Sequence, residues 1–169
     1  MDRLVGTSSG GHQVLLAAMR ALKPNYSALP GPAGIDAKQA WVISGWGVVD
    51  PLLRYNLAKK GRQQGTRASA RHVRADRGGA RGRLAAGDAE ARGEMRIAPA
   101  LVFGGDKDER VPVELMRSFV ANYNKAGGNA ELQLYEGANH GFMTGKPDAP
   151  YAAPAMERMK QFIRKHTTG

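Results

Sequence analysis

Apolar positions along the chain follow the two periods that distinguish strands from helices. Four short apolar or alternating runs are typical of strands and cover residues 4–5, 40–44, 100–103 and 131–135. Apolar residues at helical spacing follow three of these runs, over residues 14–22, 113–125 and 156–163. Pro24 ends the first helical pattern and Gly127 follows the second. Strand–helix–strand repetition predicts an α/β fold, a parallel sheet of about four strands sandwiched between helices.

Residues 59–98 interrupt this pattern. They contain no aromatic residue and only four large apolar ones, Val73, Leu84, Met95 and Ile97. Such a segment buries too little apolar area to offset the entropy lost on ordering. We therefore predict an irregular insertion at 59–98 within a single domain that spans residues 1–169.

The net charge of +10 is concentrated in the same insertion. Residues 59–83 hold nine basic side chains and one acidic one, a net of +8, whereas the other 144 residues carry a net of +2. A basic cluster attracts phosphate backbones, so a polyanion- or nucleic-acid-binding protein is an alternative function. No aromatic residue interleaves the arginines and no recognition motif appears, which argues against specific nucleic-acid binding.

Length and composition exclude several classes of protein. The 169 residues, 42% of them apolar, suffice for one domain with a packed core. The absence of cysteine excludes a disulfide scaffold and a thiolate metal site, and it fits a cytoplasmic enzyme. No apolar run approaches the roughly 20 residues of a membrane span, and the N-terminus lacks the apolar stretch of a signal peptide.

The turn after the first predicted strand matches the motif G-x-S-x-G, with the sequence Gly6-Thr7-Ser8-Ser9-Gly10. Between a strand and a helix this motif forms a nucleophile elbow, a sharp turn that exposes the central serine hydroxyl. The helix N-terminus adds positive potential, and the amide of Ser9 would point at a developing oxyanion. Taken alone, the motif is equally compatible with a phosphate-binding loop or a purely structural one.

Two further strand ends carry the groups that a serine nucleophile needs. The run over 100–103 leads to Asp106 and Asp108, and the run over 131–135 leads to His140. A serine requires an adjacent base, which histidine supplies near neutral pH, and a carboxylate fixes the histidine tautomer. The order Ser…Asp…His is that of the α/β-hydrolases, so it favours a serine hydrolase over the other two interpretations of the turn.

The chain resembles the C-terminal half of an α/β-hydrolase of the esterase/lipase type. The similarity lies in GTSSGGHQ, VISGWGVVDPLLRY, PALVFGGDKDERVP, AGGNAELQLYEGANHGF and the closing helix. It implies a carboxylic-ester hydrolase that forms an acyl-enzyme with a small-molecule ester. Ser8 would be the nucleophile, His140 the general base and Asp108 the orienting acid. Asp106 is the competing acid, and Asp108 is preferred because it stands three residues before the Val-Pro pair of the family pattern.

Two features depart from this family, and the first is the start of the chain. The sequence begins five residues before the elbow, so the half that contributes the other strands and the second oxyanion amide does not precede it. Losing one such donor costs on the order of 100–1000-fold in rate, which makes a non-catalytic fragment another alternative. The unpaired sheet edge predicts self-association.

The second departure is that the Arg-rich insertion stands where the family has a cap over the substrate pocket. Our hypothesis is a cap segment read in a shifted frame, because back-translation with a shift of one base allows residues 61–73 to read AGNKELVQAHDTY. That string has the amphipathic pattern of a helix. Sequencing of the gene tests the hypothesis, since it requires a compensating pair of single-base insertions or deletions around codons 61–95.

The remaining candidates add no chemistry at the sequence level. His12 is interpreted as a polar neighbour in the first turn of the elbow helix, and His166 as part of a fraying tail. Asp36, Asp50 and Asp148 stand at no metal-ligand spacing from any histidine, so we predict no metal and no cofactor. Asn139 and Phe142 are interpreted as loop packing, whereas Trp46 packs around its strand or lines an acyl pocket.

Overall fold

The computed structural model of the protein describes residues 2–20, 39–51, 54, 97–144 and 148–167. In this part of the chain four strands and three helices follow the predicted order. They are β1 (Asp2–Thr7), α1 (Ser9–Arg20), β2 (Gln39–Gly45), β3 (Ala100–Gly105), α4 (Val113–Lys125), β4 (Ala130–Tyr135) and α5 (Ala152–Thr167). All of the predicted insertion except Ile97 and Ala98 lies outside the described residues, and so does the frame-shifted cap hypothesised for it.

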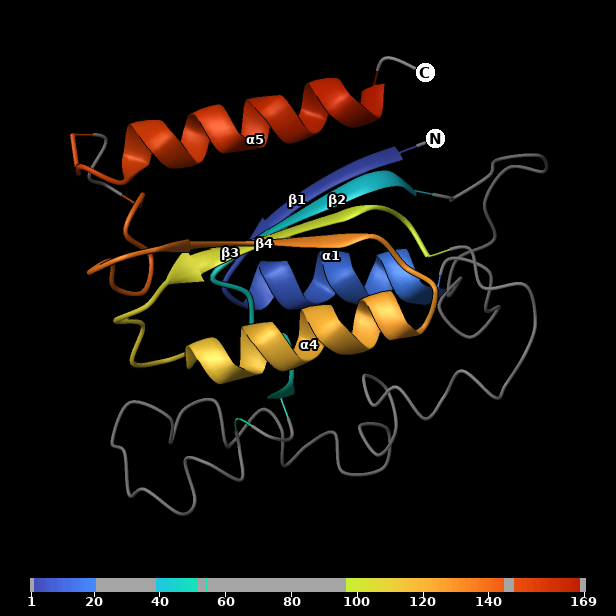
Figure 1. The fold of residues 1–169 in the computed structure, drawn as a ribbon, viewed down its shortest axis with the longest axis horizontal. Helices are drawn as coiled ribbons and strands as arrows, with labels where there is room; N and C mark the ends of the chain where they lie inside the picture. The colour runs from blue at the N-terminus through green and yellow to red at the C-terminus, as the bar shows by residue number, and fades with distance from the viewer. Residues whose placement is uncertain (1, 21–38, 52–53, 55–96, 145–147, 168–169) are drawn as a thin grey trace.

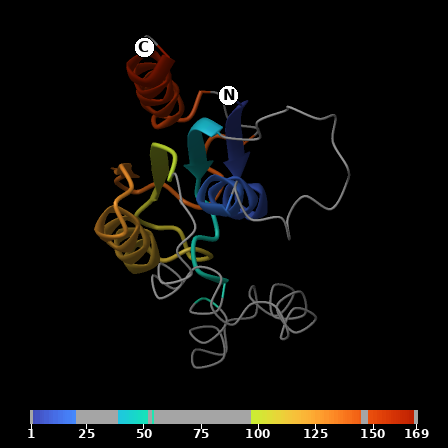
Figure 2. The same ribbon diagram turned by 90° about the vertical axis from the view of Figure 1, so that its right-hand side faces the viewer.

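The four strands form one parallel sheet in the order β1-β2-β3-β4. Helices α1 and α4 cover one face of the sheet and α5 covers the other (Figure 1). Figure 2 shows the same layers from the side, with α5 on the opposite side of the sheet from α1 and α4. The predicted α/β fold is thereby confirmed, and it brings the carboxyl ends of all four strands to one edge.

Alternation along the central strands sends side chains into two cores. In β2, Val42 packs on the side of α1 and α4, whereas Trp41 and Ile43 pack on the side of α5. Met116 and Phe162 are fully buried, one in each core. Strand β3 is buried along its whole length, which explains why it reads as a continuous apolar run rather than an alternating one.

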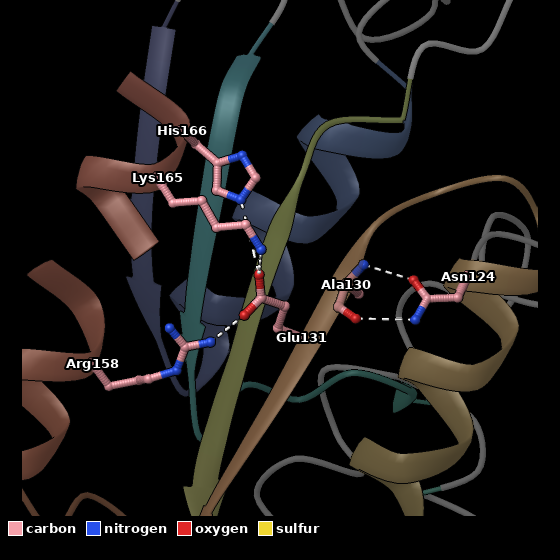
Figure 3. A network of polar contacts seen from close by, with 6 residues as sticks. All are labelled: Asn124, Ala130, Glu131, Arg158, Lys165 and His166. Atoms are coloured by element: carbon pink, nitrogen blue, oxygen red, sulfur yellow. Dashed lines mark hydrogen bonds and ion pairs between the residues drawn. The ribbon is translucent and has the colours of Figure 1, made fainter. Parts of the chain in front are cut away.

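Paired side-chain and backbone hydrogen bonds fix the start of β4 (Figure 3). The Asn124 side chain donates from Nδ2 to the carbonyl of Ala130 at 3.0 Å and accepts from the amide of Ala130 at 2.6 Å. Gly127, with a φ of +88°, lies in the turn that ends α4. These contacts set the register of β4, the strand that leads to His140.

Glu131 of β4 anchors α5 to the sheet (Figure 3). Its carboxylate accepts a hydrogen bond from Lys165 at 2.8 Å, forms an ion pair with Arg158, and lies 4.0 Å from His166 Nε2. The His166 side chain is 13% exposed, and its ring packs on Phe162 with centroids 4.5 Å apart. The interpretation of His166 as part of a fraying tail is therefore wrong, because α5 continues past it and holds its side chain against the sheet.

Replacing Glu131 with glutamine is expected to lower the free energy of unfolding by about 1 kcal/mol at pH 7. Burial raises the pKa of Glu131, but the hydrogen bonds from Lys165 and Arg158 outweigh it and leave the pKa below its ordinary value. A lowered carboxyl pKa stabilises the fold above the unfolded pKa of about 4.3, and this contribution is lost as pH falls through the folded pKa. Urea unfolding at several pH values measures the difference.

The matched control is Glu157→Gln on the outer face of α5. The Glu157 side chain is 50% exposed and lies 3.6 Å from Arg164, so its loss is expected to change the unfolding free energy little. A Glu131→Gln variant that is as stable as Glu157→Gln at pH 7, or whose deficit does not shrink in acid, would contradict the assignment of Glu131 as the anchor of α5.

Strand β1 is one of the two edge strands of the described sheet, and β4 is the other. Most side chains of β1 are at least partly exposed, and Val5 is 53% exposed. The self-association that such an edge favours stays a prediction. Within the described residues, no helix combines the length and the apolar character needed to cross a bilayer.

Candidate active site

Ser8 occupies the turn between β1 and α1. Its φ of +51° lies in the left-handed region, which is strained for a residue with a side chain. Gly6 permits the turn, because a Cβ at this position would lie 2.3 Å from the carbonyl oxygen of Gly10. The Ser8 amide donates to the carbonyl of Gly45 at 3.0 Å, so the neighbouring strand end holds the turn in place.

The structure brings three of the predicted site residues into one hydrogen-bonded row. Ser8 Oγ lies 3.0 Å from Nε2 of His140, and Nδ1 of His140 lies 2.8 Å from Oδ2 of Asp108. Because a carboxylate oxygen only accepts, the proton of this second bond is on Nδ1. A neutral imidazole then has a free lone pair on Nε2, so the hydroxyl of Ser8 donates to it. Residues from three separate strand ends meet in this row.

Asp108 is held by the start of the segment that leads to α4. Its Oδ1 accepts hydrogen bonds from the amides of Arg110 and Val111, both at 2.8 Å. Its side chain is fully buried, whereas the His140 side chain retains 14% exposure. The two amide bonds fix the carboxylate through Oδ1, while Oδ2 faces His140.

Asp106, the competing acid, has a different partner. Its Oδ1 accepts from the amide of Gly137 at 2.6 Å, in an exposed contact. The same two loops approach closely beside it, since a Cβ on Gly105 would lie 1.9 Å from the carbonyl oxygen of Ala138. Asp106 therefore ties the loop after β3 to the loop after β4, the one that carries His140.

An aromatic cluster lies behind the row, on the α5 side of the sheet. Trp46 contacts Phe103 and Phe142 with centroids 5.6 Å and 5.2 Å apart, and Phe142 also contacts Tyr135 and Tyr151. Phe142 is 7% exposed and belongs to the core, a larger role than the loop packing that the sequence suggested. Trp46 is 4% exposed, and its ring contacts lie on β3 and on the loop after β4.

Arg54 is a charged residue near Asp108 that no sequence motif singles out. Burial lowers the pKa of Arg54, an effect that the charge of Asp108 opposes and that of Arg110 reinforces. The guanidinium stays protonated, so it adds positive charge on the Asp108 side of the site. Its spacing from the motif residues follows no pattern, which is why only the fold reveals it.

Ser9, the predicted oxyanion donor, is the exposed first residue of α1. It stands at the positive end of a helix of 12 residues, where backbone amides lack intrahelical partners. His12 lies one turn further along α1, and its amide donates to the carbonyl of Ser8 at 3.3 Å. In the part of the chain that the structure describes, no three histidine or acidic side chains cluster in the way that a metal site requires.

Comparison with known proteins finds similarity to one hydrolase family and to solved esterases. Residues 88–167 match the dienelactone hydrolase family. A thermophilic esterase from the planctomycete Thermogutta terrifontis with propionate bound is similar to the chain, with a TM-score of 0.64 and 26% sequence identity. The match covers 96% of this chain and 55% of that one. The parallel sheet, its flanking helices and these matches give the chain the fold of the α/β-hydrolases.

Two other solved structures show the same fold. Thermogutta terrifontis esterase 2 phosphonylated by sarin gives a TM-score of 0.67 at 22% identity, covering 96% of this chain and 56% of that one. An acetyl ester-xyloside bifunctional hydrolase from Caldicellulosiruptor lactoaceticus gives 0.62 at 15% identity, covering 95% and 55%. The chain thus spans about half the length of these relatives. No curated protein matches its sequence.

Proposed function

We propose that this α/β-hydrolase is a carboxylic-ester hydrolase in which Ser8 is the nucleophile, His140 the general base and Asp108 the orienting acid. The observation that carries the proposal is the continuous row from Ser8 Oγ through His140 to Asp108, with distances of 3.0 Å and 2.8 Å. A serine becomes an effective nucleophile when a base within this distance takes its proton.

In the acylation step, Ser8 Oγ attacks the ester carbonyl carbon while its proton passes to Nε2 of His140. The imidazolium that forms is stabilised by Asp108, which accepts from its Nδ1. His140 then gives the proton to the departing alkoxide, the carbon–oxygen bond of the ester breaks, and the acyl group stays on Ser8. The amide of Ser9 donates to the oxyanion of the tetrahedral intermediate.

In the deacylation step, water replaces the alcohol. His140 Nε2 takes a proton from the water as its oxygen attacks the acyl carbon, and the same proton returns to Ser8 Oγ as the acid leaves. Nucleophile and base are restored, and no cofactor is consumed. The buried side chain of Asp108 keeps the His140 tautomer correct through both halves of the cycle.

The similar structures support an ester of a short acyl chain as substrate. The Thermogutta terrifontis esterase has been solved with propionate and with butyrate bound, and the same protein is phosphonylated by sarin. The family that matches residues 88–167 is named for hydrolysis of a lactone, which is a cyclic ester. We propose small uncharged esters and lactones as the substrate class to test first.

The experiment is hydrolysis of p-nitrophenyl propionate, p-nitrophenyl butyrate and a dienelactone by the purified chain, with Ser8→Ala alongside. We expect release of p-nitrophenol by the wild type and none above background by Ser8→Ala. An acyl-enzyme that accumulates gives a burst whose amplitude equals the enzyme concentration. Folded wild-type protein without activity on any of these esters, or equal activity in Ser8→Ala, contradicts the proposal.

A further inference from the structure

Trp46 has a strained backbone beside the proposed nucleophile. Its φ is +37°, and Ser8 and Trp46 are the non-glycine residues with positive φ in the described part of the chain. A bulky side chain in this region costs on the order of 1–3 kcal/mol and persists only where its surroundings impose it. The two strained residues follow adjacent strands directly, because Thr7 at the end of β1 pairs with Gly45 at the end of β2.

The backbone around Trp46 forms hydrogen bonds with both the amide and the carbonyl of Ser8. The carbonyl of Gly45 accepts from the Ser8 amide at 3.0 Å, and the amide of Val48 donates to the Ser8 carbonyl at 3.1 Å. The amide of Trp46 itself donates to the carbonyl of Phe103 at 2.5 Å, which fixes this turn to β3. Residues 45–48 therefore form a clamp on Ser8, and the left-handed Trp46 lies inside it.

The clamp also packs directly on the first turn of α1. A Cβ on Gly47 would lie 2.1 Å from Ser44 Oγ and 3.2 Å from the Cα of Gly11. A Cβ on Gly11 would likewise lie 2.7 Å from the Cα of Gly47, so glycine at both positions permits this close approach.

The indole of Trp46 extends from the clamp to the segment that carries His140. It is 4% exposed and contacts Phe142, two residues after His140, with ring centroids 5.2 Å apart at 62°. It also contacts Phe103 at 5.6 Å and 87°. Trp46 therefore belongs through its backbone to the turn that holds Ser8, and through its side chain it contacts the segment that carries His140.

Building on the proposed function, we infer that Trp46 is a positioning residue that sets the distance between Ser8 and His140. Its strained backbone places the clamp on Ser8, and its indole fixes Phe142 and with it the loop of His140. A shift of about 1 Å between nucleophile and base costs roughly 100-fold in rate. Correct placement of Ser8 and His140 therefore outweighs the strain in the Trp46 backbone.

The test compares Trp46 with Trp41, a matched control within β2, the strand that Trp46 directly follows. Both indoles are 4% exposed and both make edge contacts with aromatic rings, but Trp41 packs on Phe162 and donates to Thr167, away from Ser8. The variants are Trp46→Phe, Trp46→Ala, Trp41→Phe and Trp41→Ala. The readout is the second-order rate of fluorophosphonate labelling of Ser8, measured per folded molecule.

We expect Trp46→Ala to slow labelling by roughly 10–100-fold, whereas Trp46→Phe keeps it within about 3-fold of the wild type. Both Trp41 variants are expected to unfold at lower temperature with labelling within about 3-fold of the wild type. Phe142→Leu removes the ring contact between Trp46 and Phe142 by changing the other partner, and it is expected to slow labelling. This variant keeps the test valid if Trp46→Ala does not fold. Equal slowing by Trp41→Ala, or wild-type labelling in both Trp46→Ala and Phe142→Leu, overturns the inference.

Labelling of the wild type and a second readout distinguish failure of the proposed function from failure of the inference about Trp46. A folded wild type that is not labelled at Ser8 contradicts the hydrolase proposal. The inference is then decided by the NMR resonance of the proton on His140 Nδ1, which lies far downfield when bonded to a carboxylate. The inference requires that this resonance shifts or broadens in Trp46→Ala and not in Trp41→Ala, and an unchanged resonance in Trp46→Ala overturns it.

Discussion

Replacing His140 with alanine is expected to slow ester hydrolysis on the order of 10⁴-fold or more. The row from Ser8 to Asp108 contains one base, and without it the proton of Ser8 Oγ has no acceptor at 3.0 Å. Loss of a serine or its histidine partner removes nearly all of the rate that such a unit supplies, because the members act together. Steady-state hydrolysis of p-nitrophenyl propionate measures the effect as kcat/KM.

The matched control is His166→Gln. His166 is also a partly buried histidine beside a carboxylate, but it lies on α5 and faces Glu131. We expect its kcat/KM to stay within about 3-fold of the wild type, since distant substitutions act independently. Comparable losses in the two variants, or a His140→Ala variant that retains more than about a tenth of the activity, would mean that His140 is not the base.

Replacing Asp108 with asparagine is expected to lower kcat by about 10³–10⁴-fold with the fold intact. The amide oxygen of asparagine can still accept from Arg110 and Val111, so the loop keeps its two 2.8 Å bonds. The group that faces His140 Nδ1 becomes an NH₂ donor, which forces the proton of the imidazole onto Nε2. His140 in that tautomer cannot accept from Ser8. Far-UV circular dichroism and thermal unfolding verify that the variant is folded.

Asp106→Asn is the control that separates the two acids. Its amide oxygen can still accept from the Gly137 amide, and no contact connects Asp106 with the His140 ring, so we expect a loss of less than about 10-fold. The reverse order of effects, with Asp106→Asn the more damaging substitution, would transfer the orienting role to Asp106.

Local sequence patterns were sufficient to predict most of the fold. The strands and helices were found because the buried faces of β2, β3 and α4 impose their periods on the sequence. The meeting of Ser8 with the other two strand ends followed from topology, since parallel strands present their carboxyl ends at one edge. The parallel sheet and its flanking helices confirm that part of the prediction.

The arrangement inside the site could not be predicted with the same means. Asp106 and Asp108 are two residues apart, and only the loop geometry gives one the amide of Gly137 and the other His140. The left-handed conformation of Trp46 also escapes sequence rules, because those rules expect glycine or asparagine at such a φ. Both features arise from tertiary contacts that involve distant segments of the chain.

The most direct test of the account is covalent labelling of the purified chain by a fluorophosphonate, followed by intact mass measurement and peptide mapping. We expect one adduct per chain, on Ser8, in the wild type and no adduct in Ser8→Ala. Only an activated serine attacks the phosphorus at a useful rate, so the label reports the working pair of Ser8 and His140. A folded wild-type chain that acquires no adduct, or one labelled elsewhere and equally in Ser8→Ala, would contradict the claim that Ser8 is a catalytic nucleophile.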